Sequence, residues 1–179
     1  HFKIMKKKIL GMAVILFAFS CGNDDSVTNE EPTLLPVEEG RSQQITALYD
    51  YQIKVNQAAH VAVLNNLVTQ SLAFETNATE SELVALQEAW KTAFLNWKSN
   101  EVFNLGAIQS SFIHTRINQW PTNFEALEEN IEGEETLNSA FVSSVGANTK
   151  GYSAIEYLLF HDTNANILTE LTTAEHAER

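Results

Sequence analysis

The residues best suited to chemistry lie in the segment 151–162, Gly-Tyr-Ser-Ala-Ile-Glu-Tyr-Leu-Leu-Phe-His-Asp. Its apolar spacing predicts a helix that opens on a glycine and buries a stripe of one isoleucine and two leucines. Glu156 is set among these apolar residues, where a carboxylate is costly unless a partner satisfies it. Ser153 lies three residues earlier, so the two side chains share one helix face. Glu156 is therefore a candidate metal ligand or polar contact, and Ser153 a candidate binding residue.

Two more residues are candidates for the same site. Glu101 follows Trp90, Phe94 and Trp97 on the apolar face of a predicted helix, which directs its carboxylate inward; the alternative is a helix-end glutamate that reaches water. Trp120 could donate its indole N–H to Glu156. We predict that Trp90, Phe94 and Trp97 are core residues.

The candidates do not make up a recognisable catalytic set. The chain has no His-Glu-x-x-His, no nucleophile paired with a base, no glycine-rich phosphate loop and no calcium-binding loop pattern. His161 is five residues beyond Glu156, a spacing that does not place both on one helix face. His60 falls on an apolar stripe, where a histidine is usually a packed, hydrogen-bonded residue. We therefore predict no catalytic residue, and only Glu156 is a candidate metal ligand. The chain is predicted to be a binding module rather than an enzyme.

Helices must position these residues. Strict alternation is missing, which argues against strands, and the chain reads as an all-α, up-and-down helical bundle from about Ser42. A long first helix carries an apolar stripe from Ile45 and Tyr49 to Leu67. Thr79 and Glu82 form a capping box that begins the second helix. Further along the chain we predict a third helix from Ile108 to Trp120, with His114 and Arg116 on its more solvent-exposed side. Short helices are predicted within 123–133 and 134–142, and a turn at 146–150.

The first residues read as an export signal. Three lysines precede an apolar run from Ile9 to Phe19, which is too short to span a membrane. Cys21, the only cysteine, stands at the expected cleavage point. We predict a lipoprotein signal peptide over 1–21 with Cys21 as the lipid anchor; an ordinary secretory signal is the alternative. Asp24 and Asp25 suggest sorting to the outer membrane or cell surface.

A flexible acidic tether is predicted over 22–41, ahead of the folded region 42–179. All 23 acidic residues but only 7 of the 11 basic residues follow Cys21, which leaves a formal charge of about −16 there. Such a chain repels nucleic acid, so nucleic-acid binding is excluded. At the other end, Thr172 to Glu175 form a second capping box, but only one helical turn follows. The prediction is a chain truncated before its C-terminal half.

Three segments resemble the imelysin-like family, classed as peptidase family M75. Gly151 and Glu156 fit its signature of a glycine, any residue, a histidine, two residues and a glutamate, but Ser153 stands in place of the histidine. The segment 89–106, with Trp90, Trp97 and Glu101, is similar to another family motif. The segment 117–121 is similar to Ile-Asp-x-Trp-Pro, with Asn118 in place of the aspartate.

The resemblance covers roughly 42–179 and implies an all-helical envelope protein, often linked to iron uptake, whose histidine and glutamate could hold iron or zinc. Because a hydroxyl is a poor ligand for either metal, the serine implies weak metal binding. Three functions remain open: a lipid-anchored binding module for iron or small-ligand uptake, a metallopeptidase, and a fragment without function.

Overall fold

The computed structural model describes residues 36–133 and 135–173, and within this part every regular element is a helix. One isolated antiparallel bridge joins Asn118 to Gly151. The all-α prediction is confirmed. The predicted signal peptide, Cys21, most of the tether and the residues after Thr173 lie outside the described part. None of the described helices is long and apolar enough to cross a membrane.

The first helix is long and composite. It consists of α1 (Val37–Leu48), the π-helical turn η1 (Tyr49–Ile53) and α2 (Lys54–Thr76), which run on without a break because both residues flanking η1 keep helical dihedral angles. The helix thus begins at Val37, inside the predicted tether, and the last five tether residues are helical. The glutamates at 38 and 39 lie in its first turn, where carboxylates stabilise a helix N-terminus.

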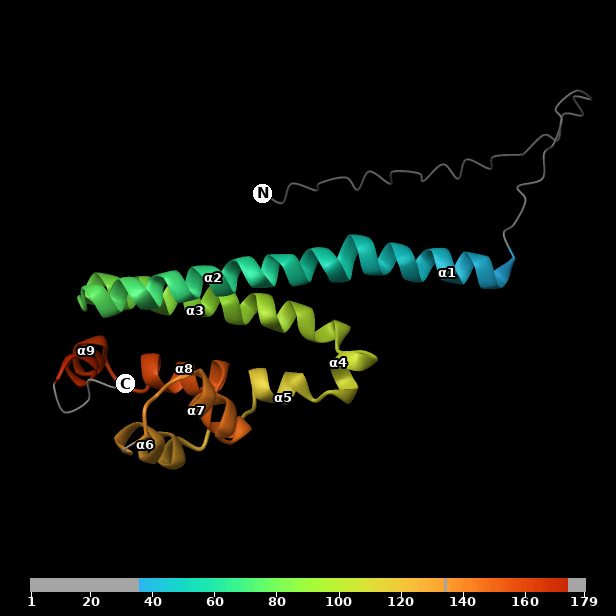
Figure 1. The fold of residues 1–179 in the computed structure, drawn as a ribbon. Helices are drawn as coiled ribbons and strands as arrows, with labels where there is room; N and C mark the ends of the chain where they lie inside the picture. The colour runs from blue at the N-terminus through green and yellow to red at the C-terminus, as the bar shows by residue number, and fades with distance from the viewer. Residues whose placement is uncertain (1–35, 134, 174–179) are drawn as a thin grey trace, which may run out of the picture. The chain divides into compact units, whose positions relative to one another are not determined.

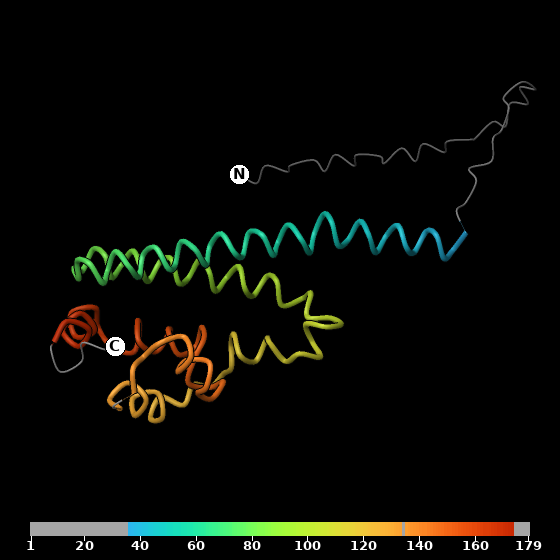
Figure 2. Tube along the Cα trace, in the orientation of Figure 1, coloured from blue at the N-terminus to red at the C-terminus, as the bar shows by residue number. Residues whose placement is uncertain are grey.

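Helix α3 (Glu80–Asn100) turns back and packs along α2, as the trace in Figure 2 shows. Thr79 begins it as predicted, because its Oγ1 accepts a hydrogen bond of 3.3 Å from the backbone N–H of Glu82. This contact satisfies one of the free backbone donors of the first turn. The pair forms an antiparallel helical hairpin.

The predicted stripe of the first helix is buried only in its second half. Leu67 is buried, whereas Ile45 and Tyr49 are 67% and 52% exposed. The reason is length: α3 ends at Asn100, whose Nδ2 donates to the carbonyl oxygen of Asn56 at 3.5 Å. The turns before Asn56 extend past the end of α3 (Figure 1), so α3 does not cover them.

Short helices connect α3 to the C-terminal pair (Figure 1). The predicted third helix is instead two helices separated by Phe112, whose left-handed φ of 52° interrupts the helical path. The helix predicted over 134–142 begins later, after Asn138, whose Oδ1 accepts from two backbone N–H groups. The elements are η2 (Glu101–Phe103), α4 (Ala107–Ser110), α5 (Ile113–Ile117), α6 (Phe124–Glu132), α7 (Ser139–Ser144) and η3 (Ala147–Thr149).

The C-terminal pair is α8 (Tyr152–Phe160) and α9 (Asn164–Thr172). Helix α9 was not predicted from the sequence, and Thr172, predicted to begin a helix, is instead the last residue of α9. The true cap is Thr163, whose side chain accepts from the N–H of Asn166 at 3.4 Å. Ile167 follows it and is fully buried. A threonine followed by helically spaced apolar residues was the available signal.

One core joins the hairpin to α8 and α9. Trp90 donates its indole N–H to the carbonyl oxygen of Tyr152 at 3.1 Å. Gln87 is buried and donates to the carbonyl oxygen of Leu159 (2.7 Å) and to Oδ1 of Asn164 (2.9 Å), which fixes the junction of the two helices. The prediction of a tryptophan-rich core face is confirmed. The buried core residues are Leu67, Phe74, Leu83, Leu86, Ala89, Trp90, Ala93, Trp97, Tyr152, Leu159 and Ile167.

Candidate functional site

Gly151 precedes the predicted signature helix α8, and the backbone conformation at this position requires a glycine. It has a φ of +76°, and a Cβ at this position would overlap the carbonyl oxygen of Ile117 and come within 3.1 Å of that of Arg116. It also forms the bridge with Asn118. Glycine therefore permits both the turn and the close approach of the chain that leaves α5.

Ser153 is buried, and its hydroxyl donates a hydrogen bond of 2.7 Å to the carbonyl oxygen of Gln119. It extends the contact that begins at Gly151, so the signature helix is attached to the segment 117–119 by a backbone bridge and a side-chain bond. The hydroxyl proton points at a carbonyl rather than at Glu156. The side chain at this position therefore joins two segments of the fold.

Glu156 is exposed, which corrects the prediction that it lies buried in an apolar run. Consecutive residues of an α-helix point about 100° apart, so apolar neighbours in the chain do not bury the residue between them. Tyr152, Ser153, Ala154 and Leu159 are the buried residues of α8. The carboxylate of Glu156 consequently bears no burial cost.

The two remaining candidates are exposed as well. Glu101 pairs with Lys98, whose Nζ lies 3.0 and 3.1 Å from its two carboxylate oxygens, and the prediction that it points inward is wrong. The face it was assigned to ends with α3 at Asn100, because the following turn is a 3₁₀ helix with a different angular step. Trp120 is 76% exposed.

These residues do not fit the metal that the signature histidine and glutamate imply. Ser153 offers a neutral hydroxyl already engaged with a backbone carbonyl, and Glu156 contributes one exposed carboxylate. Residues 36–133 and 135–173 contain no group of three or more histidine, cysteine, aspartate or glutamate side chains that could hold an ion. His161 instead pairs through Nε2 with Glu170 at 3.0 Å, and its Nδ1 lies 2.8 Å from the carbonyl oxygen of Tyr157.

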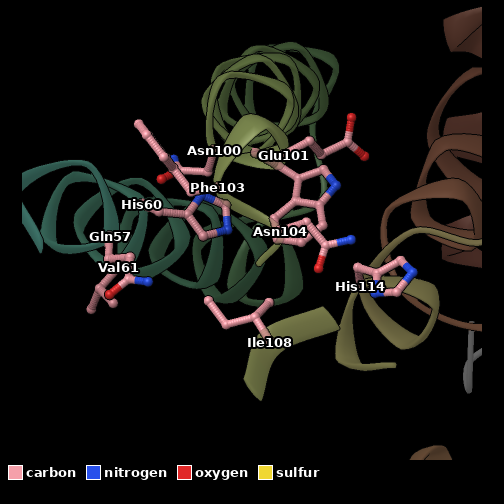
Figure 3. Close-up of a pocket in the computed structure, with 10 residues that line it drawn as sticks. Gln57, His60, Val61, Asn100, Glu101, Phe103, Asn104, Ile108 and His114 are labelled. Atoms are coloured by element: carbon pink, nitrogen blue, oxygen red, sulfur yellow. The ribbon is translucent and has the colours of Figure 1, made fainter. Parts of the chain in front are cut away.

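A pocket lies at the open end of the hairpin, between α2, the end of α3 and the short helices (Figure 3). Its volume is about 220 Å³. In Figure 3 the imidazoles of His60 and His114 lie on opposite sides of this space, while the carboxylate of Glu101 points away from it. The lining residues are Gln57, His60, Val61, Trp97, Asn100, Glu101, Phe103, Asn104, Ile108 and His114.

Buried polar atoms without a hydrogen-bond partner gather around this pocket. Four of them belong to lining residues: Trp97 Nε1, Asn100 Oδ1, Asn104 Oδ1 and His114 Nδ1. An unsatisfied buried donor or acceptor costs about 1–3 kcal/mol. A cluster of such atoms is expected where a ligand or water completes the hydrogen bonding. His114 was predicted on a wet face, but it borders this pocket and is half-buried.

Tyr152 connects the pocket wall to the signature helix. Its ring lies 6.2 Å from His60 and 6.4 Å from Trp97, and its hydroxyl is also buried without a partner. Burial raises the pKa of Tyr152 from 10.0 to about 12. His60 bonds through Nδ1 to Oδ1 of Asn96 at 3.0 Å, in line with the packed histidine predicted for it.

The polar side of this pocket was not predicted from the sequence. Asn96, Asn100 and Asn104 recur at intervals of four residues, a helical spacing that places amides on one face. Asn100 donates to the carbonyl oxygen of Asn96 at 2.9 Å and to its Oδ1 at 3.1 Å. This spacing of amides was the signal in the sequence that could have predicted the polar side of the pocket.

The fold and site define an all-α domain built on an antiparallel hairpin, with a pocket beside its signature helix. The family model of imelysin, Peptidase_M75, matches residues 47–177, and the chain belongs to this family. A search of curated proteins and a search of solved structures each returned no significant match.

Proposed function

We propose that this protein is a binding module of the bacterial envelope that takes part in iron or small-ligand uptake, and that it is not a peptidase. The observation that carries the proposal is the pocket of about 220 Å³ with its unpartnered buried polar atoms beside Tyr152. Unused hydrogen-bonding groups at an apolar pocket are typical of a ligand site.

The state of the signature residues supports binding over catalysis. A metallopeptidase needs two or three strong protein ligands and an open coordination position. Ser153 uses its hydroxyl to hold Gln119, and Glu156 is exposed. A metal-dependent activity therefore requires ligands other than this pair.

We further propose that the module is exported and attached to the outer membrane or cell surface through an acylated Cys21. The proposal is supported by the basic and apolar leader followed directly by the sole cysteine. The acidic chain disfavours anionic lipid headgroups, so the acyl chains would provide the membrane affinity. Proteins of iron uptake at the envelope are the expected partners.

Calorimetric titration with Zn²⁺ and Fe²⁺ tests the function. The full chain in detergent is compared with Ser153→His in the same buffer and pH. We expect no tight binding by the parent. Binding by Ser153→His should be stronger if a third ligand lies within reach, because an imidazole and Glu156 would share one helix face.

Binding by the parent at micromolar Kd or tighter, abolished by Glu156→Gln, would contradict the conclusion that Ser153 and Glu156 hold no metal and would restore a metalloprotein. Glu125→Gln is a matched control, since it removes an exposed helical carboxylate from α6. Cleavage of casein by the parent, lost in Glu156→Gln but kept in Glu125→Gln, would establish a peptidase instead.

A further inference from the structure

We infer that the pocket at the open end of the hairpin binds a small aromatic amine, a compound with one aromatic ring and a primary ammonium group. This inference rests on the proposed function and assigns a ligand class to its pocket. Size sets the first limit, because the pocket holds about 220 Å³. A cavity of about 150 Å³ accepts benzene, so one ring with a short side chain fits.

The walls favour a ring. Trp97 and Phe103 provide aromatic surfaces, and Val61 and Ile108 provide aliphatic ones. A flat apolar ligand removes this surface from water. The Trp97 ring, which lies 5.7 Å from that of His60, can also attract a cation near its face.

The unpartnered atoms favour a ligand with more donors than acceptors. The side-chain nitrogen of Asn100 donates to Asn96, so the side-chain atom of Asn100 without a partner is the acceptor Oδ1. The Oδ1 of Asn104 is also an acceptor without a partner. Trp97 contributes one donor through Nε1. Asn104 and His114 are half-buried and line the pocket.

The net charge of the chain also favours a cationic ligand. The chain carries 23 acidic and 11 basic residues, which gives it a net negative charge. Such a field attracts a cation and repels an anion of similar shape. An ammonium group has three donors and no acceptor, which matches the two amide oxygens. An aromatic carboxylate lacks those donors.

Tyramine is the test ligand, and 3-(4-hydroxyphenyl)propionate is its anionic counterpart of similar size. Calorimetry with the full chain in detergent should give saturable one-to-one binding of tyramine, at least tenfold tighter than the anion. Ile108→Trp fills the pocket and should weaken tyramine binding at least tenfold. Val142→Trp adds the same side chain on the exposed surface of α7 and should leave binding unchanged.

Asn104→Leu removes one acceptor with little change of volume and should weaken tyramine binding at least fivefold, which keeps the test valid if Ile108→Trp does not fold. Absence of saturable tyramine binding, equal binding of the anion, or unchanged binding by a folded Asn104→Leu variant would overturn the inference. These outcomes are distinct from those that test the proposed function: failure of tyramine binding removes the aromatic amine as the ligand class, whereas casein cleavage lost in Glu156→Gln would contradict the binding role itself.

Discussion

Replacing Tyr152 with phenylalanine removes a buried hydroxyl that has no hydrogen-bond partner and leaves the ring in place. An unsatisfied buried polar group destabilises the folded state by about 1–3 kcal/mol. The ring contacts with Trp90 and Phe94, at 6.4 and 5.6 Å between centroids, do not depend on the hydroxyl. We therefore expect Tyr152→Phe to raise the free energy of unfolding at pH 7 by about 1 kcal/mol.

The pH dependence of stability gives a second, independent measure of the burial of the Tyr152 hydroxyl. The pKa of Tyr152 is about 12 in the folded protein and 10.0 as the reference value for the unfolded chain. The stability linked to this difference is fully present below pH 10 and is lost as the pH rises through 12. The loss amounts to roughly 1.4 kcal/mol at pH 11 and approaches about 2.7 kcal/mol at higher pH.

Urea unfolding followed by circular dichroism between pH 7 and pH 11 measures both effects. The stability advantage of Tyr152→Phe over the parent should grow from about 1 to roughly 2–3 kcal/mol over this range. Tyr51→Phe is the control, because Tyr51 is 75% exposed and should change stability little. A loss of more than 1 kcal/mol for Tyr152→Phe at pH 7, or a constant difference across the pH range, would refute the reasoning.

Three further predictions concern the turn, the core and the anchor. Gly151→Ala should lower the free energy of unfolding by roughly 2–5 kcal/mol, because of backbone strain and overlap with Ile117. Gly106→Ala is the control and should lower it less, because Gly106 has a φ of +55° but open space around it. Equal shifts in the urea midpoint would contradict this prediction. Trp90→Ala should lower stability by about 3–5 kcal/mol, and a melting shift of only a degree would mean that its face is not core. Cys21→Ala should move the protein to the soluble envelope fraction or block its processing, and unchanged membrane fractionation would disprove the lipid anchor.

Helical periodicity and capping chemistry are local, and from them the start of α3 and its apolar face were predicted correctly. Thr79 begins α3 because its side chain can reach the N–H of Glu82 whatever the rest of the fold does. The apolar face with Trp90 and Trp97 was predicted correctly because those residues have too much apolar surface to remain in water. The substitution of serine for the signature histidine was likewise readable from the sequence alone.

The breaks between short helices were not readable. Phe112 has a left-handed φ without being glycine or asparagine, so nothing in its type announces the end of α4 and the start of α5. The helix α9 was missed because the threonine pair at its end resembled a cap for a new helix. In both cases a local signal was too weak to decide between alternative chain paths.

What the sequence determined by itself is the all-α class, the aromatic core face and the imelysin-like signature. The tertiary structure alone decided which polar residues border the candidate site. Glu156 is exposed and does not line the pocket, and Glu101 lines it but is itself exposed. His114, Asn104 and Trp97 contribute buried polar atoms to the same pocket although they lie in different parts of the chain. The physical reason is that burial depends on which helices pack against each other and where each one ends, and neither is fixed by the periodicity of a single helix.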